Sequence, residues 1–167
     1  MLAESMLAMA LILSTLLCTL VAGFVLLFAI VVMPGIGSLG NRDFLRAFQV
    51  VDKVIQDNQP LFLFVWLGSA AALVLAALLG FLQLEGAPRA LIVVATVLYL
   101  LGVQLPTIAV NIPLNNRVQS LNLDTLDDMS VDRERQAFEV RWNRWNGIRT
   151  VVGCVVSVVL LIAIQLT

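Results

Sequence analysis

The chain has 167 residues, of which 60% are hydrophobic and 13% are charged, with a formal net charge of −1 at pH 7. Soluble globular domains carry about 25% charged residues, so this composition excludes an ordinary soluble protein and predicts an integral membrane protein. The near balance of acidic and basic residues also offers no basic surface for nucleic acid.

Four uncharged stretches are long enough to cross about 30 Å of hydrocarbon as helices. They run from about Met6 to Met33, Leu61 to Leu84, Ala90 to Val110 and Thr150 to Leu166. Because they use most of the chain, we expect one transmembrane domain over residues 1–167, with an all-α fold that is a membrane four-helix bundle. The first stretch is too long for a secretory signal, and no basic residue precedes it.

The Lys and Arg residues lie almost entirely in the first and third connections, and only Arg89 falls in the second. Loops of membrane proteins that are rich in Lys and Arg usually lie on the cytoplasmic side. We therefore expect the first and third loops in the cytoplasm and both termini outside, in a bacterial inner membrane.

The first loop begins where Pro34, Gly35 and Gly37 end the first stretch. In Arg42–Asp57, apolar residues recur at helical spacing against polar ones. This pattern predicts a short amphipathic cytoplasmic helix, which lies at the membrane interface or caps the bundle.

The second stretch carries small residues at intervals of four: Gly68, Ala72, Ala76 and Gly80. Small side chains allow close approach of helices in lipid, so we expect a packing strip. The sequence leaves open whether this strip packs within the bundle or joins copies in a homo-oligomer.

The third stretch combines polar side chains with prolines. Gln104, Thr107, Asn111 and Asn115 fall near one helical face, and Pro106 and Pro113 interrupt the helix. The freed carbonyls need partners, so we expect a kinked, partly hydrated cytoplasmic half. For Gln104 an interhelical amide bond is the competing interpretation.

The third loop begins with a polar segment, Ser120–Asp128, that predicts coil. A second amphipathic helix is expected from about Ser130, with Ser130 as its N-cap, and it runs into the fourth stretch. Gly147 lies at that junction and is interpreted as a hinge or a close-packing point.

Two polar strings, Asn111–Arg117 and Trp142–Arg149, meet the same face of the bilayer. A bilayer rejects such groups unless they bond to one another, to water or to a ligand, so their meeting point is the predicted site. The catalytic candidates are Arg149, Arg117 and Asn111, and the ligand-binding candidates are Gln104, Asn115, Asn116, Trp142, Trp145 and Asn146. For the tryptophans, interfacial anchoring is the competing interpretation.

The sequence predicts neither a metal site nor a bound cofactor. It has no histidine, no acidic residue within a stretch and no glycine-rich phosphate motif. Cys18 and Cys154 lie at different depths, so we expect two free, buried thiols.

Three motifs resemble the anthrone-oxygenase-like family of small four-helix membrane proteins: Val32–Gly35, Asn111–Arg117 and Trp142–Thr150. The resemblance spans nearly the whole chain. It implies oxidation of polycyclic anthrones to quinones without a recognised metal or flavin. Some members carry histidines near the start of the fourth span, and this chain has none, which excludes histidine-based chemistry here.

We therefore expect a cofactor-independent oxygenase that takes a lipophilic anthrone-like or phenolic compound from the bilayer. Arg149 and Arg117 would hold the oxyanion while the asparagines orient it and the tryptophans stack on its rings. Asp52 and Glu139 are the nearest proton acceptors.

A non-catalytic scaffold or lipophile-binding protein is the alternative. A transporter fits least, because no repeated half and no mid-depth charge is present in the sequence.

Overall fold

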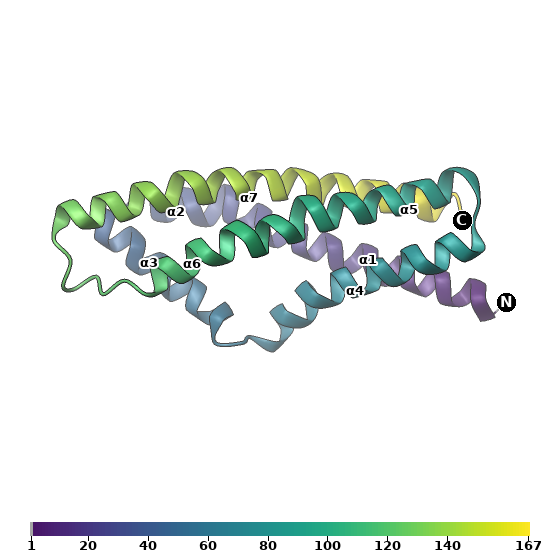
Figure 1. The fold of residues 1–167 in the computed structure, drawn as a ribbon, viewed down its shortest axis with the longest axis horizontal. Coiled ribbons are helices and arrows are strands. Elements are labelled where there is room, and N and C mark those ends of the chain that lie inside the picture. The colour runs from purple at the N-terminus through teal and green to yellow at the C-terminus, as the bar shows by residue number, and fades with distance from the viewer. Residues whose placement is uncertain (1) are drawn as a thin grey trace.

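The computed structural model describes residues 2–167 and, from Glu4 onward, their side chains (Figure 1). Its elements are α1 (Leu2–Leu27), η1 (Phe28–Val32), α2 (Met33–Gly37), α3 (Asn41–Gln56), α4 (Pro60–Gln83), α5 (Gly86–Tyr99), η2 (Leu100–Gln104), η3 (Thr107–Asn111), α6 (Ile112–Gln119) and α7 (Asp128–Gln165), where η marks π-helix. Over residues 2–167 there is no strand, so the all-α prediction is confirmed.

Four helical rods are long and apolar enough to cross a membrane: Glu4–Gly37, Pro60–Gln83, Gly86–Gln119 and Asp128–Gln165. Three of them exceed the predicted stretches. Helix α7 has 38 residues and, at 1.5 Å per residue, is about 57 Å long, against about 30 Å of hydrocarbon. One end of the bundle therefore extends well past the apolar layer.

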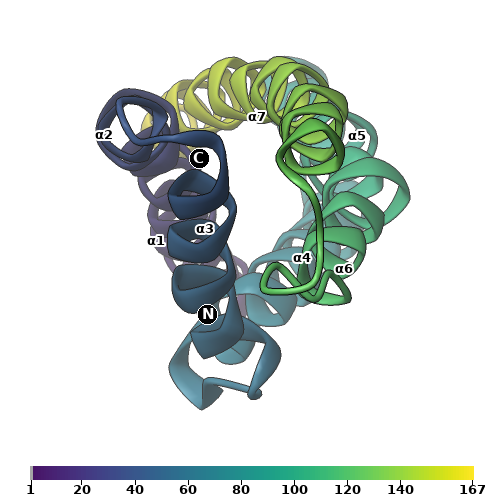
Figure 2. The same cartoon turned by 90° about the vertical axis from the view of Figure 1, so that its left-hand side faces the viewer.

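The two ends of the molecule are built from different helices. Figure 1 shows both termini and the α4–α5 turn at one end, where α1 packs on α4 and α7, and α5 packs on α4 and α7. At the other end, called the loop end here, α4 is absent and α3 packs on α6 and α7 instead. Figure 2 looks onto this end. Helix α3 thus takes the place of α4 as the fourth helix.

Helix α3 is amphipathic, and its apolar face is buried. Phe44, Leu45 and Phe48 have essentially no exposed surface, whereas Val50 and Val54 on the opposite face are exposed. Through this apolar face, α3 packs on α6 and α7.

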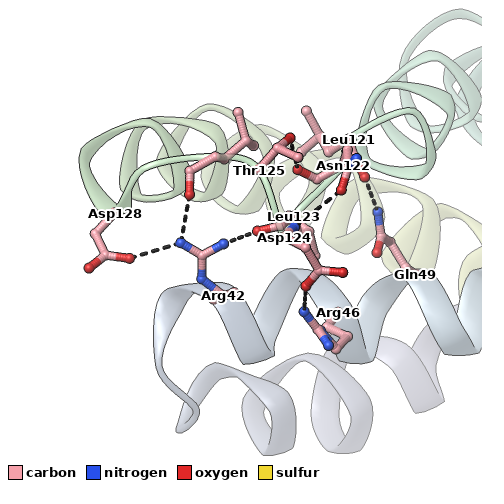
Figure 3. Close-up of polar contacts among 10 residues, drawn as sticks. Arg42, Arg46, Gln49, Leu121, Asn122, Leu123, Asp124, Thr125 and Asp128 are labelled. Atoms are coloured by element: carbon pink, nitrogen blue, oxygen red, sulfur yellow. Dashed lines mark hydrogen bonds and ion pairs between the residues drawn. The ribbon is translucent and has the colours of Figure 1, made fainter.

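The loop between α6 and α7 is fastened to α3 by polar contacts (Figure 3). Arg42 donates to the Leu123 and Leu126 carbonyls and to Asp128. Arg46 pairs with Asp124. Although this loop is coil as predicted, its backbone carbonyls have fixed partners on α3.

Helix α7 runs without a break from Asp128 to Gln165, so the third loop has no separate short helix. The prediction of Ser130 as N-cap is wrong. Asp127 caps the helix, accepting from the Ser130 amide at 2.8 Å and from its hydroxyl at 2.9 Å. These hydrogen bonds lower the pKa of the Asp127 carboxyl, because they favour its charged form. Asp127 is the better cap because its two oxygens satisfy both groups of Ser130.

The small-residue strip on α4 packs inside the bundle. Ala72, Ala76 and Gly80 are buried, and a Cβ at Gly80 would lie 3.2 Å from Ile92 Cδ1 of α5. Gly68, the first residue of the strip, is half-buried. By contrast, a Cβ at Gly147 would have no heavy atom within 4 Å, so Gly147 is not a close-packing point.

The two cysteines differ in environment. Both are free, as predicted, and Cys18 is buried. Cys154 is exposed, which corrects the expectation of two buried thiols. It lies on the outer face of α7, away from the neighbouring helices.

Each π-helical segment ends two residues before a proline: η1 before Pro34, η2 before Pro106 and η3 before Pro113. Proline removes a backbone donor, and its ring clashes with the carbonyl four residues earlier. A π turn pairs residues five apart and so makes room for the ring. The third span is therefore continued through two π turns instead of being broken.

The close approach of η2 to α7 gives a stability prediction. A Cβ at Gly102 would lie 2.7 Å from Val152 Cγ1, so Gly102→Ala should lower the free energy of unfolding by about 1 to 3 kcal/mol. Adding Val152→Ala should restore part of the loss. Gly147→Ala is the matched control and should stabilise by up to about 1 kcal/mol through helix propensity. Thermal unfolding of the detergent-purified protein measures all three, and an unaffected Gly102→Ala would contradict the packing.

Candidate functional site

Arg149 is a buried cation on α7, with 6% of its surface exposed. Its Nη1 donates to Thr107 Oγ1 and its Nη2 to Asn146 Oδ1, both at 2.9 Å. Its Nε is buried without a hydrogen-bond partner, and no described carboxylate forms an ion pair with it. A buried guanidinium normally has a carboxylate partner, because removal of a charge from water is costly. Arg149 therefore needs a specific explanation.

Two buried asparagines belong to the same polar group as this arginine, one on η3 and one on α7. Asn111, the last residue of η3, has 2% of its surface exposed. Its Nδ2 donates to the Trp142 carbonyl at 3.5 Å, and its Oδ1 is buried without a partner. Asn146 Nδ2 donates to the Val25 carbonyl of α1 at 2.9 Å. We call Thr107, Asn111, Trp142, Asn146 and Arg149 the Arg149 cluster. The cluster joins η3 to α7, and the Asn146 hydrogen bond to the Val25 carbonyl connects it to α1.

The cluster contains one buried donor and one buried acceptor that lack partners: Arg149 Nε–H and Asn111 Oδ1. Nearly all buried polar atoms in proteins are hydrogen-bonded, so each of these two groups is expected to take a water or a ligand as its partner. A hydroxyl group offers both of the missing partners, since its oxygen accepts and its hydrogen donates. The cluster is therefore suited to an enol or a phenol.

Trp142 lies beside the arginine but is enclosed by other rings. Its centroid is 5.6 Å from Phe28, 5.7 Å from Phe48 and 6.1 Å from Phe138. Arg149 Cζ lies 5.9 Å from the same centroid, within the range of a cation–π contact. With 4% of its surface exposed, Trp142 supports the guanidinium and has little free face for stacking on a ligand.

A cleft of about 280 Å³ opens between η1, α2 and α7. It is lined by Ala29, Met33, Pro34, Gly37, Glu139, Asn143 and Asn146. Its lining combines an apolar wall from the first rod with a carboxylate and two amides from α7. Asn146 belongs to both the cleft and the Arg149 cluster, and it is the residue through which the two are connected.

Some predicted residues are brought together and others are not. Asn111, Trp142, Asn146 and Arg149 are linked by hydrogen bonds and a cation–π contact. Arg117 does not join them, because it points outward and pairs through two bonds, of 2.8 and 2.9 Å, with Glu134. Just beyond Pro113, the helix turns that side chain to the surface.

Three further ligand candidates lie apart from the cluster. Gln104 contacts Tyr99 Oη at 3.3 Å, deeper in the bundle, where Tyr99 also bonds to Ser69. Asn116 accepts from Gln56 in an exposed position. Trp145 is only partly buried, and no hydrogen bond or ring contact joins it to the cluster in the described part of the chain.

Asn115 lies next to the cluster and not in it. It accepts from Trp142 Nε1 at 2.8 Å and donates to Asp52 at 2.7 Å. The two proton-acceptor candidates also differ in position. Glu139 lines the cleft. Asp52 is buried, and both its oxygens accept from amides.

Sequence reasoning did not include Thr107 among the site residues, although it placed Thr107 on the same face as Asn111. The role of the Val25 carbonyl could not be predicted from the sequence, because every residue has a backbone carbonyl.

The sequence profile of the family described as Anthrone oxygenase matches residues 59–159, which is more than half of the chain. The protein belongs to the anthrone oxygenase family. Neither the curated proteins nor the solved structures give a match. The match covers α4 through most of α7 and so includes Asn111, Trp142 and Arg149. Helices α1 and α3 lie outside it.

The two arginines give a contrasting pair of predictions. Arg149→Met keeps much of the side-chain volume and removes an unpaired buried charge, so the thermal stability should be unchanged or higher. Arg117→Ala breaks an exposed ion pair and should cost less than about 1 kcal/mol. Thermal unfolding in detergent tests both. If Arg149→Met instead lowers the thermal stability as much as a large-to-small core substitution does, the main role of the arginine is to stabilise the fold.

Proposed function

We propose that this anthrone oxygenase-family protein is a cofactor-independent oxygenase of a lipophilic, enolisable anthrone-like or phenolic compound. The observation that carries the proposal is the buried Arg149 with its unpartnered Nε–H, in a cluster that also holds the unpartnered Asn111 Oδ1. Family membership supplies the substrate class. The positive-inside pattern supports a site near the cytoplasmic face of a bacterial inner membrane, with both termini outside.

The substrate would lie in the cleft with its rings against Ala29, Met33 and Pro34. Its carbonyl or enol oxygen would point past Asn146 to Arg149 Nε. Such a compound is neutral while it is in the bilayer and becomes an anion only upon deprotonation. An arginine without a carboxylate partner is suited to this change, because its free donor strengthens its hydrogen bond as negative charge develops.

Glu139 is the proposed proton acceptor. It lines the cleft together with Asn146, and it is held by Arg135 Nε at 2.8 Å through Oε2. Glu139 would take the proton from the ring carbon opposite the carbonyl, and the electron pair of that C–H bond would move onto the oxygen. Arg149 would then stabilise the enolate.

The enolate would react with dioxygen directly. One electron passes from the enolate to dioxygen, and the two radicals combine to form a carbon–oxygen bond. The protonated Glu139 returns its proton to the peroxide. Loss of the remaining hydrogen of that carbon as a proton, with cleavage of the O–O bond, gives the second quinone carbonyl and water. One oxygen atom of dioxygen enters the quinone and the other enters water, so no external reductant is required.

Oxygen uptake with a panel of anthrones tests the proposal. Wild-type protein in nanodiscs should consume one dioxygen per quinone formed, above the rate of spontaneous oxidation in empty nanodiscs. Arg149→Met should lower kcat by about 10²- to 10³-fold, the usual effect of removing an oxyanion donor. Glu139→Gln should also lower kcat, whereas Arg117→Ala should keep wild-type activity.

The scaffold alternative gives a different result. It predicts a lipophile bound to the purified protein in native mass spectrometry but no oxygen uptake with any anthrone. Unaltered turnover by Arg149→Met would exclude the oxyanion role even if the wild-type protein is active.

A further inference from the structure

We infer that Asp52 on α3 is a positioning residue that fixes Trp142, and through it Arg149, by way of the Asn115 amide. The functional part of this inference rests on the proposed oxygenase activity. Its structural part, which concerns the orientation of Trp142, does not.

Asp52 is a buried carboxylate, 2% exposed, that is held by amides alone. Its Oδ1 accepts from Asn115 Nδ2 at 2.7 Å. Its Oδ2 accepts from Gln56 Nε2 at 2.9 Å and from Gln119 Nε2 at 3.0 Å. No Lys or Arg of the described chain forms an ion pair with it. Like Arg149, Asp52 is therefore a buried charge without a counter-ion in contact.

The direction of the Asn115 amide follows from the groups at its two ends. The Trp142 indole N–H can only donate, so it must meet Asn115 Oδ1, as it does at 2.8 Å. The NH₂ end of the same amide then faces Asp52, and a carboxylate can only accept. A neutral amide at residue 52 could face Asn115 with either end. The charged carboxylate thus selects the one Asn115 orientation that binds the indole.

The indole orientation matters because Arg149 lies over its ring. The hydrogen bond to Asn115 sets the rotation of Trp142 within its aromatic surroundings, and the ring face then supports the guanidinium by a cation–π contact. A carboxylate in direct contact would occupy the donors of Arg149. The Asn115–Trp142 link instead lets the charge of Asp52 act on Arg149 from a distance and leaves Nε free for the substrate oxygen.

A simpler interpretation is that Asp52 only fastens α3 to α6. Gln49 already does so. Its side-chain Nε2 donates to the Val118 and Leu121 carbonyls, and its backbone carbonyl accepts from Gln119 Nε2. The fastener interpretation predicts a loss of stability with Trp142 unaffected. The positioning interpretation predicts a changed indole environment and a lower kcat at similar KM.

The test compares Asp52→Asn with the exchanged pair Asp52→Asn/Asn115→Asp. In the exchanged pair, the carboxylate introduced on α6 can accept from the indole and from the amide introduced on α3. The oxygen of that new amide can accept from Gln56 and Gln119, so every hydrogen bond is kept. The readout is the ¹⁵N-indole NMR resonance of Trp142, assigned with Trp142→Phe, together with kcat and KM. Asp52→Asn should shift or split the resonance and lower kcat on the order of 10- to 100-fold, as expected for misplaced catalytic groups.

The exchanged pair should give a single Trp142 indole resonance, shifted only by its new carboxylate acceptor, and should restore most of kcat. Gln49→Ala is the matched control, because it loosens α3 without touching Asp52, and it should lower thermal stability while the resonance stays in place. An unchanged Trp142 resonance in Asp52→Asn would overturn the inference. If Asp52→Asn fails to fold, an exchanged pair that folds with a split Trp142 resonance would overturn it equally. Absence of oxygen uptake by the wild-type protein would defeat the proposed function alone, since the NMR comparison needs no turnover.

Discussion

The burial of a guanidinium without a carboxylate is the constraint on which the loop end of this molecule depends. Removal of Arg149 from water is costly, and an ion pair would be the usual compensation. Here the compensation is divided among a threonine hydroxyl of η3, an asparagine amide of its own helix and the face of Trp142. Each partner is neutral. The charge is therefore stabilised without being neutralised, provided that α1, η3 and α7 keep a fixed register.

That register depends on the prolines. Pro106 and Pro113 follow η2 and η3, and Pro34 follows η1. A π turn changes the direction in which the following side chains point, and such turns are frequent at functional sites. Thr107 begins η3 and Asn111 ends it, and these two residues contact Arg149 and the Trp142 carbonyl. The wide turn thus presents two polar groups to α7 in a helix whose outer face remains apolar.

The sequence predicted the four spans and the meeting of the two polar strings, because hydropathy and polar clustering are local properties of the chain. It did not separate Gln104 from Asn111. Their offset of seven residues matches one face only at 3.6 residues per turn, and both η2 and η3 depart from that period. For a related reason, nothing in the local spacing of Arg117 indicated Glu134 on α7 as its partner. Asp52 could not be tied to Trp142 at all, because the link passes through three separate elements.

The position at which α4 begins determines which helices form the loop end of the bundle. Since α4 starts at Pro60, partway along the bundle, the polar loop end would lack a fourth wall without α3, which packs on α6 and α7 there. The family match begins at residue 59, so the part of the chain that carries Arg149 lies within it and the covering helix α3 lies outside it. In the proposed reaction, the missing counter-ion of Arg149 is the enolate itself. A carboxylate beside Arg149 would have stabilised the resting protein, but it would have competed with the enolate for the same donors. Asp52, kept at a distance by Asn115 and Trp142, avoids that competition.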